Sequence, residues 1–203
     1  MVHHHLQEGV HGLMRWWLKT RRTFTVLTAL AMVSMGLAVW IGGQSVMLPS
    51  FFSNSQRAVL TVFLPIPAVA ALSLSLDSRL AAFEMTAVRF VPGRDVLLVL
   101  AALAGCLVFA GLFWSPTGMS VARNIAFLTG LMLLARPWAR QAAVMVPLTW
   151  IALVVFFSHR PYPDPDPWTV LPEPATAVHA AIAAVVMLTA GLTLLPRTRQ
   201  EPT

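Results

Sequence analysis

Long runs of apolar residues alternate with short polar segments along the whole chain. Six of these runs are about 17 to 20 residues long, which is the length of a helix that crosses a bilayer. They occupy residues 24–42, 58–76, 96–114, 117–135, 142–158 and 176–195. None of them shows the period-two alternation of a membrane β-strand. The pattern therefore predicts an all-α polytopic membrane protein with six transmembrane helices.

The composition supports a lipid environment. Hydrophobic residues make up 57% of the 203 residues and charged residues only 11%, which leaves too little polar surface to cover a soluble globule. Inside a bilayer every backbone N–H and C=O must be satisfied within the protein, and helices meet that requirement.

The gaps between the runs differ strongly in positive charge. On the side of both termini they hold Arg15, Lys19, Arg21, Arg22, Arg79, Arg89, Arg94, Arg136, Arg140, Arg197 and Arg199. The opposite side holds only Arg57, Arg123 and Arg160. Because cytoplasmic loops are enriched in Lys and Arg, both termini are predicted to be cytoplasmic. The net charge of +6 then reflects topology, and nucleic acid is not expected as a partner.

The N-terminal part of the chain contains two different segments. Residues 1–12 are expected to be a flexible leader, and residues 13–203 a single transmembrane domain. Residues 13–22 have the spacing of an amphipathic helix that lies in the cytoplasmic membrane interface. Its apolar face contains Leu13, Met14, Trp16 and Trp17, and its basic face contains Arg15, Lys19 and Arg22. A cleavable signal peptide is an alternative for residues 24–42, but that run is too long and no small-residue cleavage site follows it.

Three features inside the runs bear on helix shape and packing. Pro65 and Pro67 predict a kink or break near the middle of the second helix, and Pro147 predicts a milder one in the fifth. Cys106 is the single cysteine, so no intrachain disulfide can form, and we expect it to be a small packing residue. Small residues recur in the third run at a spacing that allows close helix contact and oligomers: Ala101, Ala104, Gly105 and Gly111.

Residues 77–94 form the longest predicted cytoplasmic connection. A short helix is expected there, with Asp77 or Ser78 as its N-cap and with Pro92 and Gly93 ending it. Its apolar face contains Leu80, Phe83, Ala87 and Phe90, while Arg79, Thr86 and Arg89 point elsewhere. Such an apolar face either lies on the membrane surface or docks into a partner, and the sequence favours neither.

The external connection, residues 159–175, is rich in proline. Alternating prolines favour an extended, stiff segment, with Trp168 as an interfacial anchor, so an external cap is expected. A cation site formed by His159, Asp164 and Asp166 is the less favoured alternative. His179, near the outer end of the sixth run, is expected to make a polar contact rather than to bind haem.

Missing motifs exclude several kinds of activity. The sequence has no G-x-x-x-x-G-K-[ST] phosphate loop, no H-E-x-x-H, no G-x-S-x-G and no cysteine pair. The predicted spans contain no Asp or Glu, which excludes the usual proton or sodium relay. We therefore expect no enzymatic activity, catalytic residue, cofactor or metal in this chain.

The arrangement resembles the permease subunit of ABC-type exporters of the second class. The shared features are the amphipathic helix at 13–22, six spans with cytoplasmic termini, a helical connection at 77–89 and a structured external piece between spans five and six. Residues 76–89 also look like actinobacterial membrane proteins associated with such transporters.

The resemblance implies partners and a location. This chain would assemble with a separate ATP-binding subunit and with a second permease subunit, which is the same or a different chain. The complex would lie in the bacterial cytoplasmic membrane, in contact with membrane lipids. It would move a lipidic, peptide or drug-like cargo outward. The ATP-binding subunit would dock on Arg79, Leu80, Phe83, Glu84, Ala87 and Arg89. The interfacial helix, with Arg15, Trp16, Trp17, Lys19 and Arg22, would transmit motion. The alternative is a non-transporting membrane anchor, assembly factor or regulatory subunit, and a membrane enzyme is a third interpretation.

Overall fold

The computed structural model describes residues 22–41, 44–48, 56–83, 91–158 and 166–195. These residues form α-helices α2 (Arg22–Ile41), α3 (Pro65–Phe83), α4 (Val91–Leu112), α5 (Pro116–Ala139), α6 (Met145–Phe157) and α7 (Val178–Leu194). Strands β1 (Ser45–Leu48) and β2 (Gln56–Val59) pair antiparallel, with Ser45 opposite Val59. Three short 3₁₀ helices complete the described part: η1 (Leu60–Val62), η2 (Arg140–Val144) and η3 (Pro167–Thr169).

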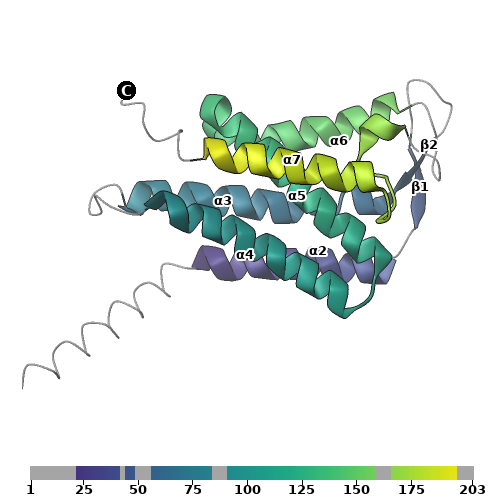
Figure 1. Ribbon diagram of the computed structural model, residues 1–203, viewed down its shortest axis with the longest axis horizontal. Coiled ribbons are helices and arrows are strands. Elements are labelled where there is room, and N and C mark those ends of the chain that lie inside the picture. Colours follow the sequence, from purple (N-terminus) through teal and green to yellow (C-terminus); the bar gives the residue numbers. More distant parts are fainter. Residues whose placement is uncertain (1–21, 42–43, 49–55, 84–90, 159–165, 196–203) are drawn as a thin grey trace, which may run out of the picture.

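The helices lie side by side along the long axis of the molecule (Figure 1). The β1–β2 hairpin lies at one end, called the hairpin end below. The start of α2, the end of α3 and the end of α7 lie at the other end, called the connection end because α3 finishes and α4 begins there (Figure 1). Helix α5 crosses the middle of the bundle and contacts α2, α3, α4, α6 and α7.

The predicted helical fold is confirmed in the described residues, with the hairpin as an unexpected addition. Among the described residues, three helical stretches are long and apolar enough to cross a membrane, judged by length and composition: Leu60–Asp77, Asp95–Leu112 and Pro116–Phe157. The third stretch contains α5, η2 and α6. The apolar helices Ala29–Ile41 and Val178–Leu194 are shorter. These helices are those of a membrane protein.

The predicted kinks are wrong, because the prolines begin helices instead of interrupting them. Helix α3 starts at Pro65, so Pro65 and Pro67 both lie in its first turn. Proline suits this position since the first N–H groups of a helix have no partner inside it, and the fixed φ is already helical. Pro147 likewise lies in the first turn of α6. The residues before Pro65 that were predicted to start the span are instead β2, η1 and a turn.

The prediction that a separate helix begins at Asp77 or Ser78 is also wrong. Helix α3 runs without a break through both residues to Phe83, so neither is an N-cap. Helix α4 begins at Val91, so Pro92 and Gly93 lie in its first turn instead of ending a helix. Proline at the second position of a helix costs no hydrogen bond. Residues 84–90, between the two helices, lie outside the described residues.

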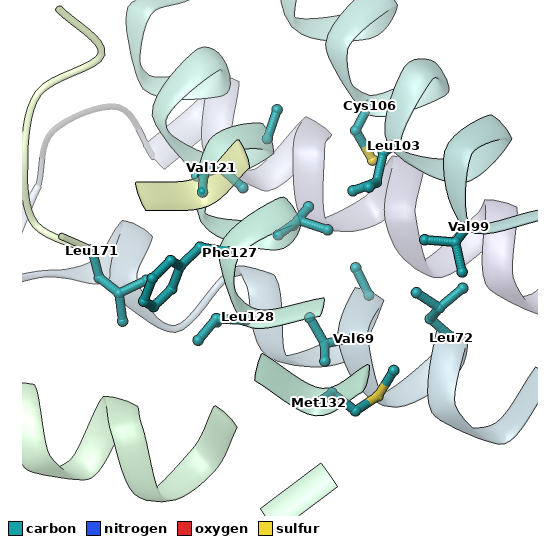
Figure 2. Packing of buried hydrophobic residues seen from close by; sticks show 14 of the residues in the cluster. Val69, Leu72, Val99, Leu103, Cys106, Val121, Phe127, Leu128, Met132 and Leu171 are labelled. Carbon is teal, nitrogen blue, oxygen red and sulfur yellow. The ribbon is translucent and has the colours of Figure 1, made fainter. Parts of the chain in front are cut away.

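Apolar side chains of α3, α4 and α5 fill the centre of the bundle (Figure 2). Val69, Val99 and Leu128 from the three helices belong to one buried cluster. Leu171, which is far along the chain, joins the same cluster and lies beside Phe127 in this view (Figure 2). Cys106 is a free thiol buried in this cluster, as expected for a packing residue.

Candidate functional site

The turn between α4 and α5 sets the position of the first buried arginine. Trp114 has a φ of 46°, which lets the chain reverse within residues 113–115. Ser115 then caps α5, and its Oγ accepts a hydrogen bond of 3.1 Å from the N–H of Gly118. Pro116 follows as the first helical residue. These local signals place Arg123 two turns inside α5, next to Asn124.

Arg123 is buried and donates to backbone carbonyls far along the chain. Its side chain bonds to the carbonyl oxygens of Pro174 (2.8 Å), Glu173 (2.8 Å) and Val170 (3.0 Å). Nε and Nη2 also donate to Oδ1 of Asn124, at 3.2 and 3.0 Å. Only 8% of Arg123 is exposed. A charged guanidinium with five N–H donors suits a ring of carbonyls, because each charge-assisted bond offsets part of the desolvation of the cation.

Asn124 extends the same contact. Its Nδ2 donates to the carbonyl oxygen of Leu171 at 2.8 Å, and the residue is completely buried. Arg123 and Asn124 together therefore hold four backbone carbonyls of residues 170–174. We call residues 166–177 the cap segment, because they fold over the hairpin end of α5 and α7 (Figure 1).

The cap segment is tightly turned. Oγ1 of Thr169 donates to the carbonyl of Asp166 at 2.6 Å, and the N–H of Leu171 bonds to the carbonyl of Thr169. Val170 lies between them with φ of 47° and ψ of −47°, which is a strained conformation for a β-branched residue. Strain of this kind persists only where surrounding contacts hold it, and the Val170 carbonyl is one of the acceptors of Arg123.

Aromatic contacts attach the cap segment to α6. The rings of Trp150 and Trp168 meet edge to face with centroids 6.5 Å apart. The ring of Phe127 on α5 lies 5.7 Å from that of Trp150. Oγ of Ser158 adds a long hydrogen bond of 3.4 Å to Oδ2 of Asp166. The cap segment is thus in contact with both α5 and α6.

The second buried arginine lies at the connection end of α5. Nη2 of Arg136 is 2.5 Å from Oδ1 of Asp77 on α3, and 8% of Arg136 is exposed. Asp77 lies six residues before the end of α3, and Arg136 three before the end of α5. The ion pair therefore joins the last turns of α3 to the central helix. The sequence pattern predicts Arg136 as one of the cytoplasmic charges and Asp77 or Ser78 as an N-cap, and it does not predict this ion pair. The signal in the sequence is an acidic and a basic residue directly after the ends of two apolar runs.

Two glycines bring α5 and α7 into backbone contact. A Cβ atom built on Gly130 would lie 2.4 Å from the carbonyl carbon of Met187. A Cβ on Gly191 would lie 2.8 Å from the carbonyl oxygen of Gly130. Both positions therefore require glycine. The small residues predicted to mediate close contact in the third run behave differently. Ala101, Ala104, Gly105 and Gly111 are exposed on α4.

The predicted docking residues are only partly described. Arg79, Leu80 and Phe83 lie in the last turns of α3, whose backbone is described. Glu84, Ala87 and Arg89 lie outside the described residues, as do Arg15, Trp16, Trp17 and Lys19 of the predicted interfacial helix. Arg22 is the first residue of α2. The docking surface and the interfacial helix stay predictions.

The residues considered for metal or haem can be placed in part. His159 and Asp164 lie outside the described residues, and among those described no group of three side chains is placed to hold a metal ion. His179 makes a polar contact, as expected: its Nε2 lies 3.4 Å from Oε1 of Glu173, whose carbonyl accepts from Arg123. His179 is about half exposed.

Exposed tryptophans mark both ends of the bundle. Trp40 lies in the last turn of α2 and Trp114 follows the end of α4, both at the hairpin end, with exposed fractions of 83% and 92%. Trp138, at the connection end of α5, is 80% exposed. Tryptophan is enriched where a membrane protein crosses the two membrane–water interfaces. Helix α5, which begins two residues after Trp114 and contains Trp138 in its last turn, has 24 residues, or about 36 Å, enough to cross the hydrocarbon core.

No protein-family model, curated protein or solved structure matches the chain significantly. Its function is therefore inferred from the features described above: a membrane-type helical bundle, a central helix, and a buried arginine at each end of that helix.

Proposed function

We infer that the chain crosses the bacterial cytoplasmic membrane six times, with both termini and the connection end in the cytoplasm. The alternation of helices α2–α7 along one axis supports this arrangement (Figure 1). The exposed tryptophans at both ends lie where interfacial residues belong. Eleven of the fourteen Lys and Arg residues lie on the side assigned to the cytoplasm.

Within that topology, the chain is the membrane subunit of an ATP-driven exporter of the second ABC class. It works with a second permease subunit and a separate ATP-binding subunit, and its cargo is lipidic, peptide-like or drug-like. The ATP-binding subunit binds the end of α3 and the residues that follow it, and this site includes Phe83 and Glu84. ATP binding then stabilises one conformation of the membrane subunits over another.

The Asp77–Arg136 ion pair is the observation that carries this proposal. A partner that binds the end of α3 contacts a helix whose last turns are joined to α5 by this ion pair. Helix α5 in turn contacts every other helix of the described bundle. Thirteen of its 24 residues are buried, so a displacement of α5 must be felt by its neighbours. The fold thus provides a direct mechanical path from the predicted docking site to the centre of the bundle.

Replacement of Phe83 by Ala together with Glu84 by Arg tests the docking site. The full chain would be affinity-purified from its native host in mild detergent, and co-purified ATPase activity and subunit stoichiometry measured. We expect the double variant to reach the membrane in normal amount but to lose the associated ATPase. The reason is that the apolar contact of Phe83 and the peripheral negative charge of Glu84 are removed from the interface.

The matched control is Gln141→Arg, which introduces an arginine into the exposed connection between α5 and α6. It should retain the ATPase. Normal association and stimulation of the ATPase by the double variant would overturn the docking assignment.

A non-transporting anchor or assembly subunit is the second candidate. The packing of α5 supports it: Leu128, Met132 and Leu133 are completely buried, and Gly130 contacts the backbone of α7. A dense apolar centre suits a rigid scaffold as well as a mobile permease. Recovery of a membrane complex that contains no ATPase would favour the anchor, whereas a stoichiometric soluble ATPase would favour the exporter.

A further inference from the structure

The two buried arginines lie on one helix, and each binds a different part of the chain at an opposite end of the bundle. Arg136 binds Asp77 of α3 at the connection end. Arg123 binds the carbonyls of Val170, Glu173 and Pro174 at the hairpin end. Thirteen residues, or about 20 Å along the helix axis, separate the two side chains. Neither contact is made with a neighbouring residue of the same turn, so each fixes α5 to a distant part of the chain.

Helix α5 is closely packed between the two arginines. Its N-terminus is capped by Ser115, and most of the side chains between the two arginines are buried. Interior packing of this density transmits displacements instead of absorbing them. Gly130 also lies against the backbone of α7, so α5 and α7 shift together.

The cap segment depends on Arg123 in a specific way. Val170 has a positive φ, which its own side chain disfavours, and its carbonyl is held by Arg123. Thr169 beside it is completely buried. A shift of α5 that lengthens the bonds of Arg123 therefore removes support from a strained turn, and such a turn relaxes when its contacts are lost.

We propose that α5 couples the connection end to the cap segment, so that the Asp77–Arg136 pair controls how tightly residues 166–177 close over the hairpin end. Release of Arg136 by movement of α3 displaces α5, weakens the bonds of Arg123 and opens the cap. The proposal goes beyond docking of an ATPase: it assigns a conformational output at the far end of the bundle. It rests on the proposed function only for the event that moves α3.

Cysteine accessibility in the purified full chain in lipid nanodiscs tests the coupling. In a Cys106→Ala background, Thr169→Cys reports opening of the cap, because residue 169 is fully buried when the cap is closed. Thr176→Cys, at an exposed position of the same segment, reports the accessibility of a site that needs no opening. Both faces of a nanodisc are open to a maleimide, so the result does not depend on orientation or on an ATPase.

We expect Arg136→Gln to raise the maleimide labelling rate at position 169 by at least about fivefold, the factor that corresponds to losing one modest stabilising contact. Labelling at position 176 should stay within about twofold. The matched control Arg140→Gln makes the same chemical change four residues later at an exposed side chain, and should leave both rates unchanged. Asp77→Asn, a milder change to the α3 partner of the ion pair, should raise the labelling rate at position 169 as Arg136→Gln does. If Arg136→Gln fails to fold, the Asp77→Asn variant tests the coupling.

Three results would overturn the coupling. The first is an unchanged rate at position 169 in both the Arg136 and Asp77 variants while Arg123→Gln raises it, since the two ends would then be independent. The second is an equal increase with Arg140→Gln, which would indicate a general charge effect. The third is a parallel increase at positions 169 and 176 in Arg136→Gln and Asp77→Asn, since the bundle would then have loosened as a whole. Loss of ATPase docking with intact coupling, or the reverse, separates this proposal from the proposed function.

Discussion

At the scale of single residues, Arg123 shows how a cation is accommodated inside an apolar bundle. Removing a guanidinium from water costs several kcal/mol, and the cost is offset only when its donors are bonded. Arg123 bonds to three backbone carbonyls and to the Asn124 amide oxygen. The carbonyls of Val170 and Glu173 also gain a donor that no helix or sheet of the turned cap segment provides. Lysine would replace only some of these bonds, since an ammonium group lacks the planar fork of donors.

Arg123→Gln should therefore lower the free energy of unfolding by about 2–4 kcal/mol, since several charge-assisted bonds are lost and the carbonyls of Val170 and Glu173 each lose a donor. Arg123→Lys should give a smaller loss. Thermal unfolding of the purified protein in detergent measures both. Arg140→Gln, at an exposed arginine on the same helix end as Arg136, should change stability by less than about 0.5 kcal/mol. A destabilisation by Arg140→Gln as large as that by Arg123→Gln would show that the bonds of Arg123 are not responsible.

At the scale of elements, the glycines divide into two groups with different consequences. Gly130 and Gly191 let α5 and α7 approach until their backbones touch. Gly105 and Gly111 on α4 have no atom within 4 Å of an added Cβ. The sequence presents all four as small residues in apolar runs. A glycine that permits close packing differs from an exposed glycine only in whether it faces a neighbouring helix.

Gly130→Ala should destabilise the bundle by about 1–3 kcal/mol, because the new methyl group would collide with the Met187 backbone, which cannot move without shifting α7. Gly111→Ala is the matched control, and it should be neutral or stabilise by about 0.5–1 kcal/mol through lower chain entropy in the unfolded state. Melting temperatures of the two variants in the same detergent provide the comparison. Equal melting temperatures would mean that α5 and α7 are not in backbone contact.

At the scale of the whole molecule, charge and aromatic side chains give the bundle two different ends. Exposed Trp40 and Trp114 lie at the hairpin end and exposed Trp138 at the connection end. Among the described residues, the basic ones that lie toward the connection end include Arg22, Arg79, Arg94, Arg136 and Arg140. In the proposed topology, the tryptophans mark the two membrane interfaces and the excess of arginine marks the cytoplasmic one.

Labelling of intact cells with a membrane-impermeant maleimide checks the proposed orientation. In a Cys106→Ala background, Thr176→Cys should be labelled from outside, because its exposed position lies at the hairpin end. Gln141→Cys is also at an exposed position, at the opposite end, and should be labelled only after the cells are permeabilised. The reverse pattern would place the connection end outside and remove the docking site from the reach of a cytoplasmic ATPase.

The sequence by itself determined the helical class, the number of apolar runs and the approximate position of each described helix. Runs this long have few alternatives in lipid, because the backbone must satisfy its own hydrogen bonds. The sequence did not determine how Pro65 and Asp77 would be used. Proline both starts and breaks helices, and an aspartate near a run can cap a helix or pair with a distant charge. Which role applies depends on where the neighbouring segment lies.

Only the tertiary structure decided which polar residues act together. Asp77 and Arg136 are 59 positions apart, and Arg123 and Pro174 are 51 apart. No local pattern links residues at such separations, because their proximity is produced by the packing of α3, the cap segment and α7 around α5. The hydrophobic pattern sets which helices form, whereas contact between their sides sets which buried charges find partners.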